Sequence, residues 1–174
     1  MHALGIQRAA SWAPLVAVQP MYNLVKRTAE IELLPMAQSL GVGVIPYSPT
    51  GGGLLTGKYG VGKAPPNGRL LDTKMYTTRY ADPAFYEVAD KFCAFAREYG
   101  EVPAALAVAW VASHPGVTSV LVGGRTVEQL AQTLAANSIE LDQETRARIS
   151  ALSPAPPPAT DRNEETTAHN YGVR

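Results

Sequence analysis

The order of apolar and polar residues predicts strands that alternate with helices. Three short runs are almost continuously apolar, as in strands that are buried on both faces: residues 16–19, 42–47 and 118–123. Each run is followed by polar or glycine-rich residues and then by residues with a helical period. This alternation predicts a parallel sheet in an α/β fold.

Capping residues predict where the helices begin and end. Asp82-Pro83 predicts the start of a long helix, and Gly100 predicts its end. Residues 126–129 form a capping box, which predicts a helix with Leu130 and Leu134 directed inward. Further helices are predicted over residues 30–40, from Pro103 to about Ser113, and after an N-cap at Asp142.

One interval interrupts this alternation. Between Thr50 and Ala81 lie about thirty residues that are rich in Gly, Pro, Lys, Arg and Tyr and have no strong helical period. Loops this long in compact domains are usually functional, and this one follows the second strand at the end where α/β folds bind ligands. We therefore expect a lid or strap over a ligand. Its tyrosines can touch a substrate or, as we expect, pack the strap onto the fold.

Composition narrows the class of protein. Lysine plus arginine and aspartate plus glutamate both number 15, so the net charge is zero, which argues against a nucleic-acid partner. The apolar runs are too short for a bilayer, and the first residues lack a signal-peptide pattern, which predicts a cytoplasmic protein without a membrane partner. Cys93 is the only cysteine and is expected to be buried. The three histidines lack metal-ligand spacing, so no metal is predicted.

Two junctions between a strand and the residues after it could bind an anion. Residues 47–53 end in three glycines, whose N–H groups can approach a phosphate, and Lys58 follows; a simple flexible turn is the alternative. In the second junction, Gly123, Gly124 and Arg125 lead directly into a capped helix, where the alternative is a plain turn with a solvated arginine. Together they repeat the phosphate site that follows the last two strands of many (β/α)₈ barrels.

Six stretches resemble the aldo/keto reductase family, in the family's order and spacing, from about residue 4 to residue 152. They are Val18–Leu24, Glu32–Pro35, Gly41–Pro49, Gly53–Tyr59, Ala105–Val111 and Val122–Leu130. The resemblance implies an α/β fold that is part of a TIM (β/α)₈ barrel, roughly strands six to eight with their helices. Residues 1–152 would be the C-terminal part of that barrel, and residues 153–174 a Pro-rich polar tail.

The resemblance also implies that NADP(H) binds across the mouth of the barrel. Gln19 would bond to the nicotinamide carboxamide, and Tyr47 would stack on the nicotinamide ring. The remaining expected contacts are Ser48, Pro49, Thr50, Gly51, Lys58 and Arg69 around the pyrophosphate, Gly123 and Arg125 at the 2′-phosphate, and Gln129, Gln132 and Thr133 at the adenosine. The sequence departs from the family pattern at Thr50, where leucine is frequent, at Gln132, where glutamate is common, and at Thr133, where asparagine is usual.

The catalytic aspartate, tyrosine, lysine and histidine of the family would precede residue 1, so no residue of this chain is assigned a catalytic role. The expected function is the cofactor-binding part of a truncated NADPH-dependent oxidoreductase that reduces aldehydes or ketones, with the small carbonyl substrate left unspecified. Alternatives are a non-catalytic NADP-binding or subunit-interaction protein of the same fold and a phosphosugar-binding barrel fragment. The open edges of a partial barrel predict self-association.

Overall fold

The computed structural model describes residues 2–157; most of the expected tail lies outside the described residues. The first two predicted strands are present as β1 (Ala17–Val18) and β2 (Gly43–Val44), and they are parallel as expected. Their pairing continues beyond the assigned strands, because the Ile45 amide donates to the Val18 carbonyl at 3.0 Å and the Tyr47 amide to Pro20 at 2.9 Å. The carboxyl ends of both strands are therefore held side by side.

The expectation of a third strand over residues 118–123 is wrong for the described chain. The segment does run beside β2, since the Thr118 amide donates to the Val44 carbonyl and the Leu121 amide to the Pro46 carbonyl, both at 2.9 Å. However, the Val44 amide donates to the Thr118 hydroxyl at 3.0 Å and not to a backbone carbonyl. A side chain thus takes the place of a backbone acceptor, and the regular ladder is not formed.

The predicted helices are confirmed, with α2 preceded by a separate 3₁₀ turn. The Asp82 side chain caps α5 by accepting from the Ala84 amide at 2.9 Å, and Gly100 ends this helix in the left-handed conformation, with φ of 82°. Asp142 caps α8 in the same way. The elements are α1 (His2–Ala9), η1 (Thr28–Glu30), α2 (Leu33–Leu40), η2 (Gly51–Thr56), α3 (Arg69–Asp72), α4 (Lys74–Arg79), α5 (Pro83–Tyr99), α6 (Pro103–Ala112), α7 (Val127–Leu134), η3 (Ala135–Ser138) and α8 (Gln143–Ser150).

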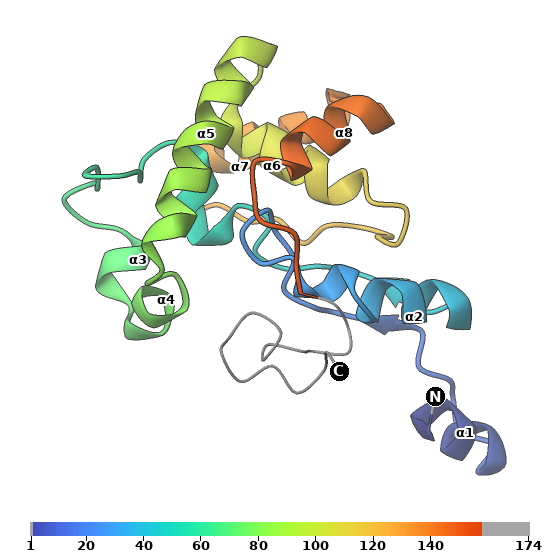
Figure 1. Cartoon of the computed structure of the whole chain (residues 1–174). Helices are drawn as coiled ribbons and strands as arrows, with labels where there is room; N and C mark the ends of the chain where they lie inside the picture. The colour runs from blue at the N-terminus through green and yellow to red at the C-terminus, as the bar shows by residue number, and fades with distance from the viewer. Residues whose placement is uncertain (1, 158–174) are drawn as a thin grey trace, which may run out of the picture.

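Helix α6 lies in the centre of the fold. Every residue from Ala104 to Val111 is buried, which is the arrangement expected of a helix that is apolar on all sides. Helices α5, α7 and α8 surround it, and α1 and the α3–α4 pair lie at opposite ends of the molecule (Figure 1). Cys93 is buried on α5, as predicted. None of the helices in residues 2–157 is long and apolar enough to cross a membrane.

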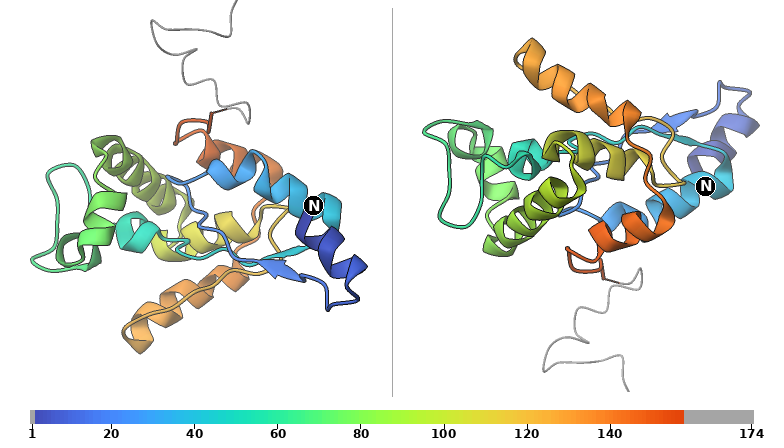
Figure 2. Two further views of the ribbon diagram at one scale, coloured as in Figure 1. Left: turned by 90° about the horizontal axis from the view of Figure 1, so that it is seen from below. Right: turned by 90° about the horizontal axis from the view of Figure 1, so that it is seen from above.

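Helix α7 projects from the rest of the fold in both views of Figure 2. The expectation that Leu130 and Leu134 face inward is wrong, because these side chains are 38% and 48% exposed. The buried position of this helix is Thr133, whose hydroxyl donates to the Leu130 carbonyl at 2.9 Å. The contact of α7 with α6 therefore buries Thr133, while Leu130, which shares its helix face at i−3, and Leu134 stay partly exposed.

A polar network ties α8 to Tyr22 and η1. The Tyr22 hydroxyl donates to Glu30 at 2.6 Å, and Arg146 of α8 donates to the same hydroxyl at 3.1 Å. Arg27 holds both carboxylate oxygens of Glu30, at 3.0 and 2.9 Å. Burial raises the pKa of Glu30, but the bonds from Arg27 and Tyr22 outweigh it, and the pKa lies below its ordinary value. This network is structural, because it links η1, α6 and α8.

Candidate cofactor site

The first junction that was expected to bind an anion is an ordered turn, which we call the glycine loop (residues 47–53). Ser48 adopts a left-handed conformation, with φ of 61°, which is uncommon for a residue with a side chain. Its carbonyl accepts from the Asn23 side-chain amide at 3.0 Å and from the Gly51 amide at 2.9 Å. The loop therefore has a defined shape that contacts from outside the loop help to hold.

The three glycines are required by this shape. Gly51, Gly52 and Gly53 have φ of 62°, 68° and 100°, all in the region that only glycine adopts freely. A Cβ on Gly52 would lie 2.9 Å from the Tyr76 ring. Among the predicted contacts in the loop, Pro49 and Gly51 are buried, whereas Tyr47, Ser48 and Thr50 are partly exposed. The exposed members of the loop are those that could touch a ligand.

Residues 54–81, which we call the strap, contain the second half of η2 and all of α3 and α4 instead of an irregular loop. Tyr80 at its end is fully buried, and its ring stacks on that of Tyr76 at a centroid distance of 6.3 Å. The expectation that tyrosines pack the strap onto the fold is therefore confirmed for these two residues. Residues 57–68 extend away from the main body, between η2 and α3 (Figure 1).

Lys58 lies against Gly53 of the glycine loop, and two further cationic side chains are near enough to act on its charge. Lys58 follows η2, Arg69 begins α3 and Arg125 precedes α7. Burial lowers the pKa of Lys58, and the positive charges of Arg125 and Arg69 lower it further. Within residues 2–157, none of the three has a carboxylate within 4.0 Å, since the salt bridge found there joins Arg27 and Glu30. The structure thus brings like charges together from three separate segments.

The second junction is capped as the sequence predicts. The Gln129 amide donates to the Thr126 hydroxyl at 3.3 Å, and the Arg125 amide donates to the Gln129 side-chain oxygen at 3.0 Å. A Cβ on Gly124 would lie 2.7 Å from the Leu130 amide nitrogen, so this glycine is needed for the turn itself. At Gly123 a Cβ would meet nothing within 4 Å, which leaves open space beside Arg125.

The predicted adenosine contacts occupy different environments on α7. Gln129 uses its side-chain oxygen for the cap, Gln132 is exposed, and Thr133 is buried with its hydroxyl bonded to its own helix. Gln19, predicted to bind nicotinamide, is exposed and directly follows β1. Strand β1 pairs with β2, the strand that leads to Tyr47. Gln19 and the glycine loop lie at the carboxyl ends of adjacent strands, whereas the three α7 residues belong to the projecting helix (Figure 2).

One residue at this site, Asn23, was given no role from the sequence. Asn23 is fully buried and donates to the Ser48 carbonyl, and its amide nitrogen also lies 3.3 Å from the Tyr80 hydroxyl. The available signal was a single asparagine within the otherwise apolar run 21–25. A buried polar side chain must find partners, but the sequence does not show that they are residues 25 and 57 positions away.

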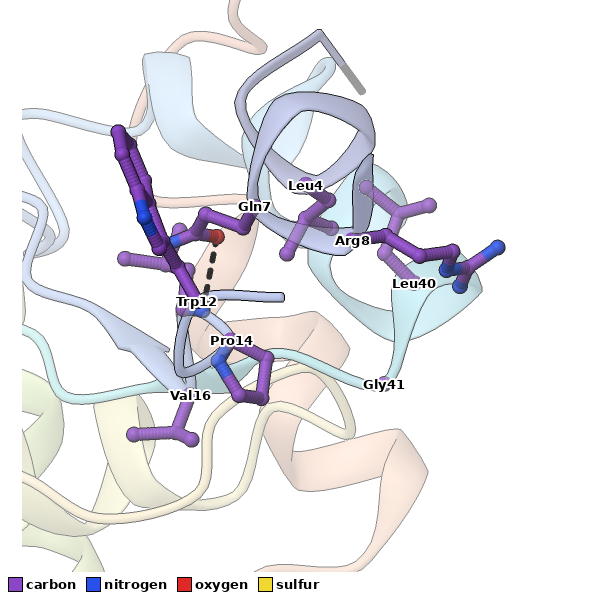
Figure 3. Close-up of a pocket in the computed structure, with 9 residues that line it drawn as sticks. Leu4, Gln7, Arg8, Trp12, Pro14, Val16, Leu40 and Gly41 are labelled. Carbon is purple, nitrogen blue, oxygen red and sulfur yellow. Dashed lines mark hydrogen bonds between the residues drawn. The ribbon is translucent and has the colours of Figure 1, made fainter. Parts of the chain in front are cut away.

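A cavity lies elsewhere in the described residues. It has a volume of about 510 Å³ and is formed where α1 meets the residues before β1 and β2 (Figure 3). Its lining includes Leu4, Trp12, Val16 and Gly41. Because Val16 and Gly41 precede the strands, this cavity is at the opposite end of the sheet from the glycine loop. In residues 2–157 no three His, Cys, Asp or Glu side chains gather as metal ligands would.

The fold is a mixed α/β arrangement whose loops after parallel strands gather cationic and glycine-rich segments. The chain belongs to the aldo/keto reductase family, whose model matches residues 3–154. Family membership implies a TIM-barrel fold, an oxidoreductase and, in general, a nicotinamide cofactor. It decides against a phosphosugar-binding barrel.

Curated relatives agree with this assignment. The chain is 39% identical over 144 residues to the "Uncharacterized oxidoreductase YrpG" of Bacillus subtilis (strain 168), which covers 82% of this chain and 41% of that protein. It is 33% identical to "Protein tas" of Escherichia coli (strain K12), covering 79% and 40%. It is 32% identical to a "Probable voltage-gated potassium channel subunit beta" of Oryza sativa subsp. japonica, covering 84% and 46%. The chain therefore spans less than half the length of these relatives.

Proposed function

We propose that this chain is the cofactor-binding part, roughly strands six to eight, of an NADPH-dependent aldo/keto reductase that converts aldehydes or ketones to alcohols. The observation that carries the proposal is the group of Lys58, Arg69 and Arg125 beside the glycine loop. Like charges that gather without a carboxylate disfavour each other, and a bound polyanion relieves that repulsion. NADPH carries its anionic groups at two places, the pyrophosphate and the 2′-phosphate, and the cations come from two sides of the site.

The residues present fit such a cofactor. In the proposal, the glycine loop with Lys58 and Arg69 holds the pyrophosphate, and Arg125 forks onto the 2′-phosphate beside the open space at Gly123. Tyr47 and Gln19 orient the nicotinamide at the carboxyl ends of adjacent strands. When bound, NADPH supplies the hydride that reduces the carbonyl carbon. This chain's own residues bind and orient, and we place the proton donor for the carbonyl oxygen on another part of the whole protein.

A charge reversal tests the proposal. Fluorescence titration of the purified chain should show NADPH binding, and Lys58→Glu should weaken it by more than about a hundredfold, because an attraction to the pyrophosphate is replaced by a repulsion. Lys91→Glu is the matched control, since Lys91 is an exposed lysine on α5. No NADPH binding by the chain, or equal effects of the two substitutions, would count against the proposed function.

A second candidate is a subunit that binds NADP without turnover. It is favoured by relatives whose names describe potassium channel β subunits, such as the rice protein. Both candidates use the same cofactor site, so binding does not separate them. Turnover does: the whole protein should consume NADPH with a carbonyl compound in the first case and bind it without consumption in the second.

A further inference from the structure

The residue that holds the glycine loop in its left-handed shape lies outside that loop. In residues 2–157, Ser48 is one of two residues other than glycine with a positive φ, and the other is Ser11 near α1. Such conformations persist where the surroundings fix them. Around Ser48 the fixing contact from outside the loop is the Asn23 amide, which donates to its carbonyl at 3.0 Å.

Asn23 is itself fixed on all sides. It is fully buried, and its side-chain oxygen accepts from the Val25 amide at 3.2 Å, which sets the direction of the amide nitrogen. That nitrogen lies between the Ser48 carbonyl and the Tyr80 hydroxyl, the latter at 3.3 Å. One amide group therefore joins the segment after β1, the glycine loop and Tyr80 near the end of the strap.

The Tyr80 hydroxyl adds a second link to the same place. It is fully buried at the end of the strap, and it lies 3.9 Å from the Met21 sulfur. Its hydrogen bonds to Ser48 and Asn23 lower its pKa, but burial has the larger effect, and the pKa is raised overall. The ring also lies 3.6 Å from where a Gly51 Cβ would be. Tyr80 thus contacts the glycine loop from the strap side.

We propose that Asn23 and Tyr80 are positioning residues that lock the strap and the glycine loop into one unit, so that the loop amides and Lys58 are in place before the cofactor arrives. The inference rests on the proposed function only for its effect on NADPH. Neither residue needs to touch the cofactor, because both act through Ser48. Loss of the Asn23 or Tyr80 hydrogen bonds should make the glycine loop more mobile before the protein unfolds.

The test compares two tyrosines of the strap. Tyr80→Phe removes the hydroxyl at the glycine loop. Tyr59→Phe removes an equally buried hydroxyl that accepts from the Leu70 amide and does not contact Ser48. Amide hydrogen exchange of Gly51, which donates to the Ser48 carbonyl, should speed up about tenfold in Tyr80→Phe, the change expected from one lost hydrogen bond. It should stay unchanged in Tyr59→Phe. Asn23→Leu, which is of similar size and cannot donate, should repeat the Tyr80→Phe result.

The two proposals can fail separately. If the lock is real, Tyr80→Phe weakens NADPH binding about tenfold, again one hydrogen bond, while Tyr59→Phe does not. If the unmodified chain binds no NADPH, the proposed function fails, and the exchange of Gly51 alone decides the positioning role. Equal exchange of Gly51 in both variants, or no change in either, overturns the inference.

Discussion

Replacing Arg125 by alanine should change cofactor selectivity without changing the fold. The side chain is exposed, and within residues 2–157 it has no carboxylate within 4.0 Å. Its backbone amide, not its guanidinium, donates to Gln129, so the cap of α7 survives the substitution. The variant therefore removes one cation from the site and little else.

The size of the effect follows from the contact that would be lost. A hydrogen bond to a charged group contributes about 1.5–3 kcal/mol, and each 1.4 kcal/mol is a factor of ten in affinity. In residues 2–157 no carboxylate pairs with Arg125, so binding a phosphate breaks no existing ion pair. Most of the hydrogen-bond energy should therefore appear as cofactor affinity. We expect Arg125→Ala to weaken NADPH by about tenfold to a hundredfold. NADH lacks the 2′-phosphate, so its affinity should hardly change.

The assay is a fluorescence titration of both cofactors against the unmodified chain, Arg125→Ala and the control Arg97→Ala. Arg97 is an exposed arginine near the end of α5. The control should leave both affinities unchanged. Equal losses of NADPH and NADH in Arg125→Ala would refute the 2′-phosphate assignment and would mean that Arg125 acts on the pyrophosphate or on the turn.

Three further outcomes are expected. The isolated chain should not reduce an aromatic aldehyde, because loss of acid catalysis alone typically costs about 10²–10⁴-fold, and steady NADPH consumption would contradict this. Glu30 contributes stability above its ordinary pKa of 4.5 that is lost as pH falls toward its lowered folded-state pKa, so urea titrations should show a smaller acid loss in Glu30→Gln. The free edge of β1 and the exposed Trp12 and Val16 beside it should promote self-association, which a monodisperse monomer in sedimentation velocity would disprove.

The predictions that held depend on local sequence. Asp82, Thr126 and Asp142 cap helices because an N-cap side chain bonds to a backbone amide two or three residues further on. Gly100 ends α5 for an equally local reason, its positive φ. The glycine loop was identified from three adjacent glycines, which the observed φ angles require. Predictions of this kind depend on neighbouring residues only, so the packing of distant segments does not change them.

The predictions that failed depend on distant residues. The run 118–123 has the composition of a strand, but the Thr118 hydroxyl takes the Val44 amide, 74 positions away in the sequence. The helical spacing of Leu130 and Leu134 predicts that both face the core, but the packing of α7 on α6 buries Thr133 instead. No periodicity within the segment itself could show either result, because each is decided by what lies opposite.

The site combines both kinds of information. The family resemblance assigned Lys58, Arg69 and Arg125 one at a time, and nothing in their spacing showed that their charges act on one another. The structure adds that Arg125 and Arg69 lower the pKa of Lys58. Because these cations lie on the strap and before α7, an anion bound among them would offset their mutual repulsion. The hydrogen bonds that Asn23 donates to the Ser48 carbonyl and the Tyr80 hydroxyl join the strap to the glycine loop without a ligand, so the strap and the loop are already in contact when the anion binds.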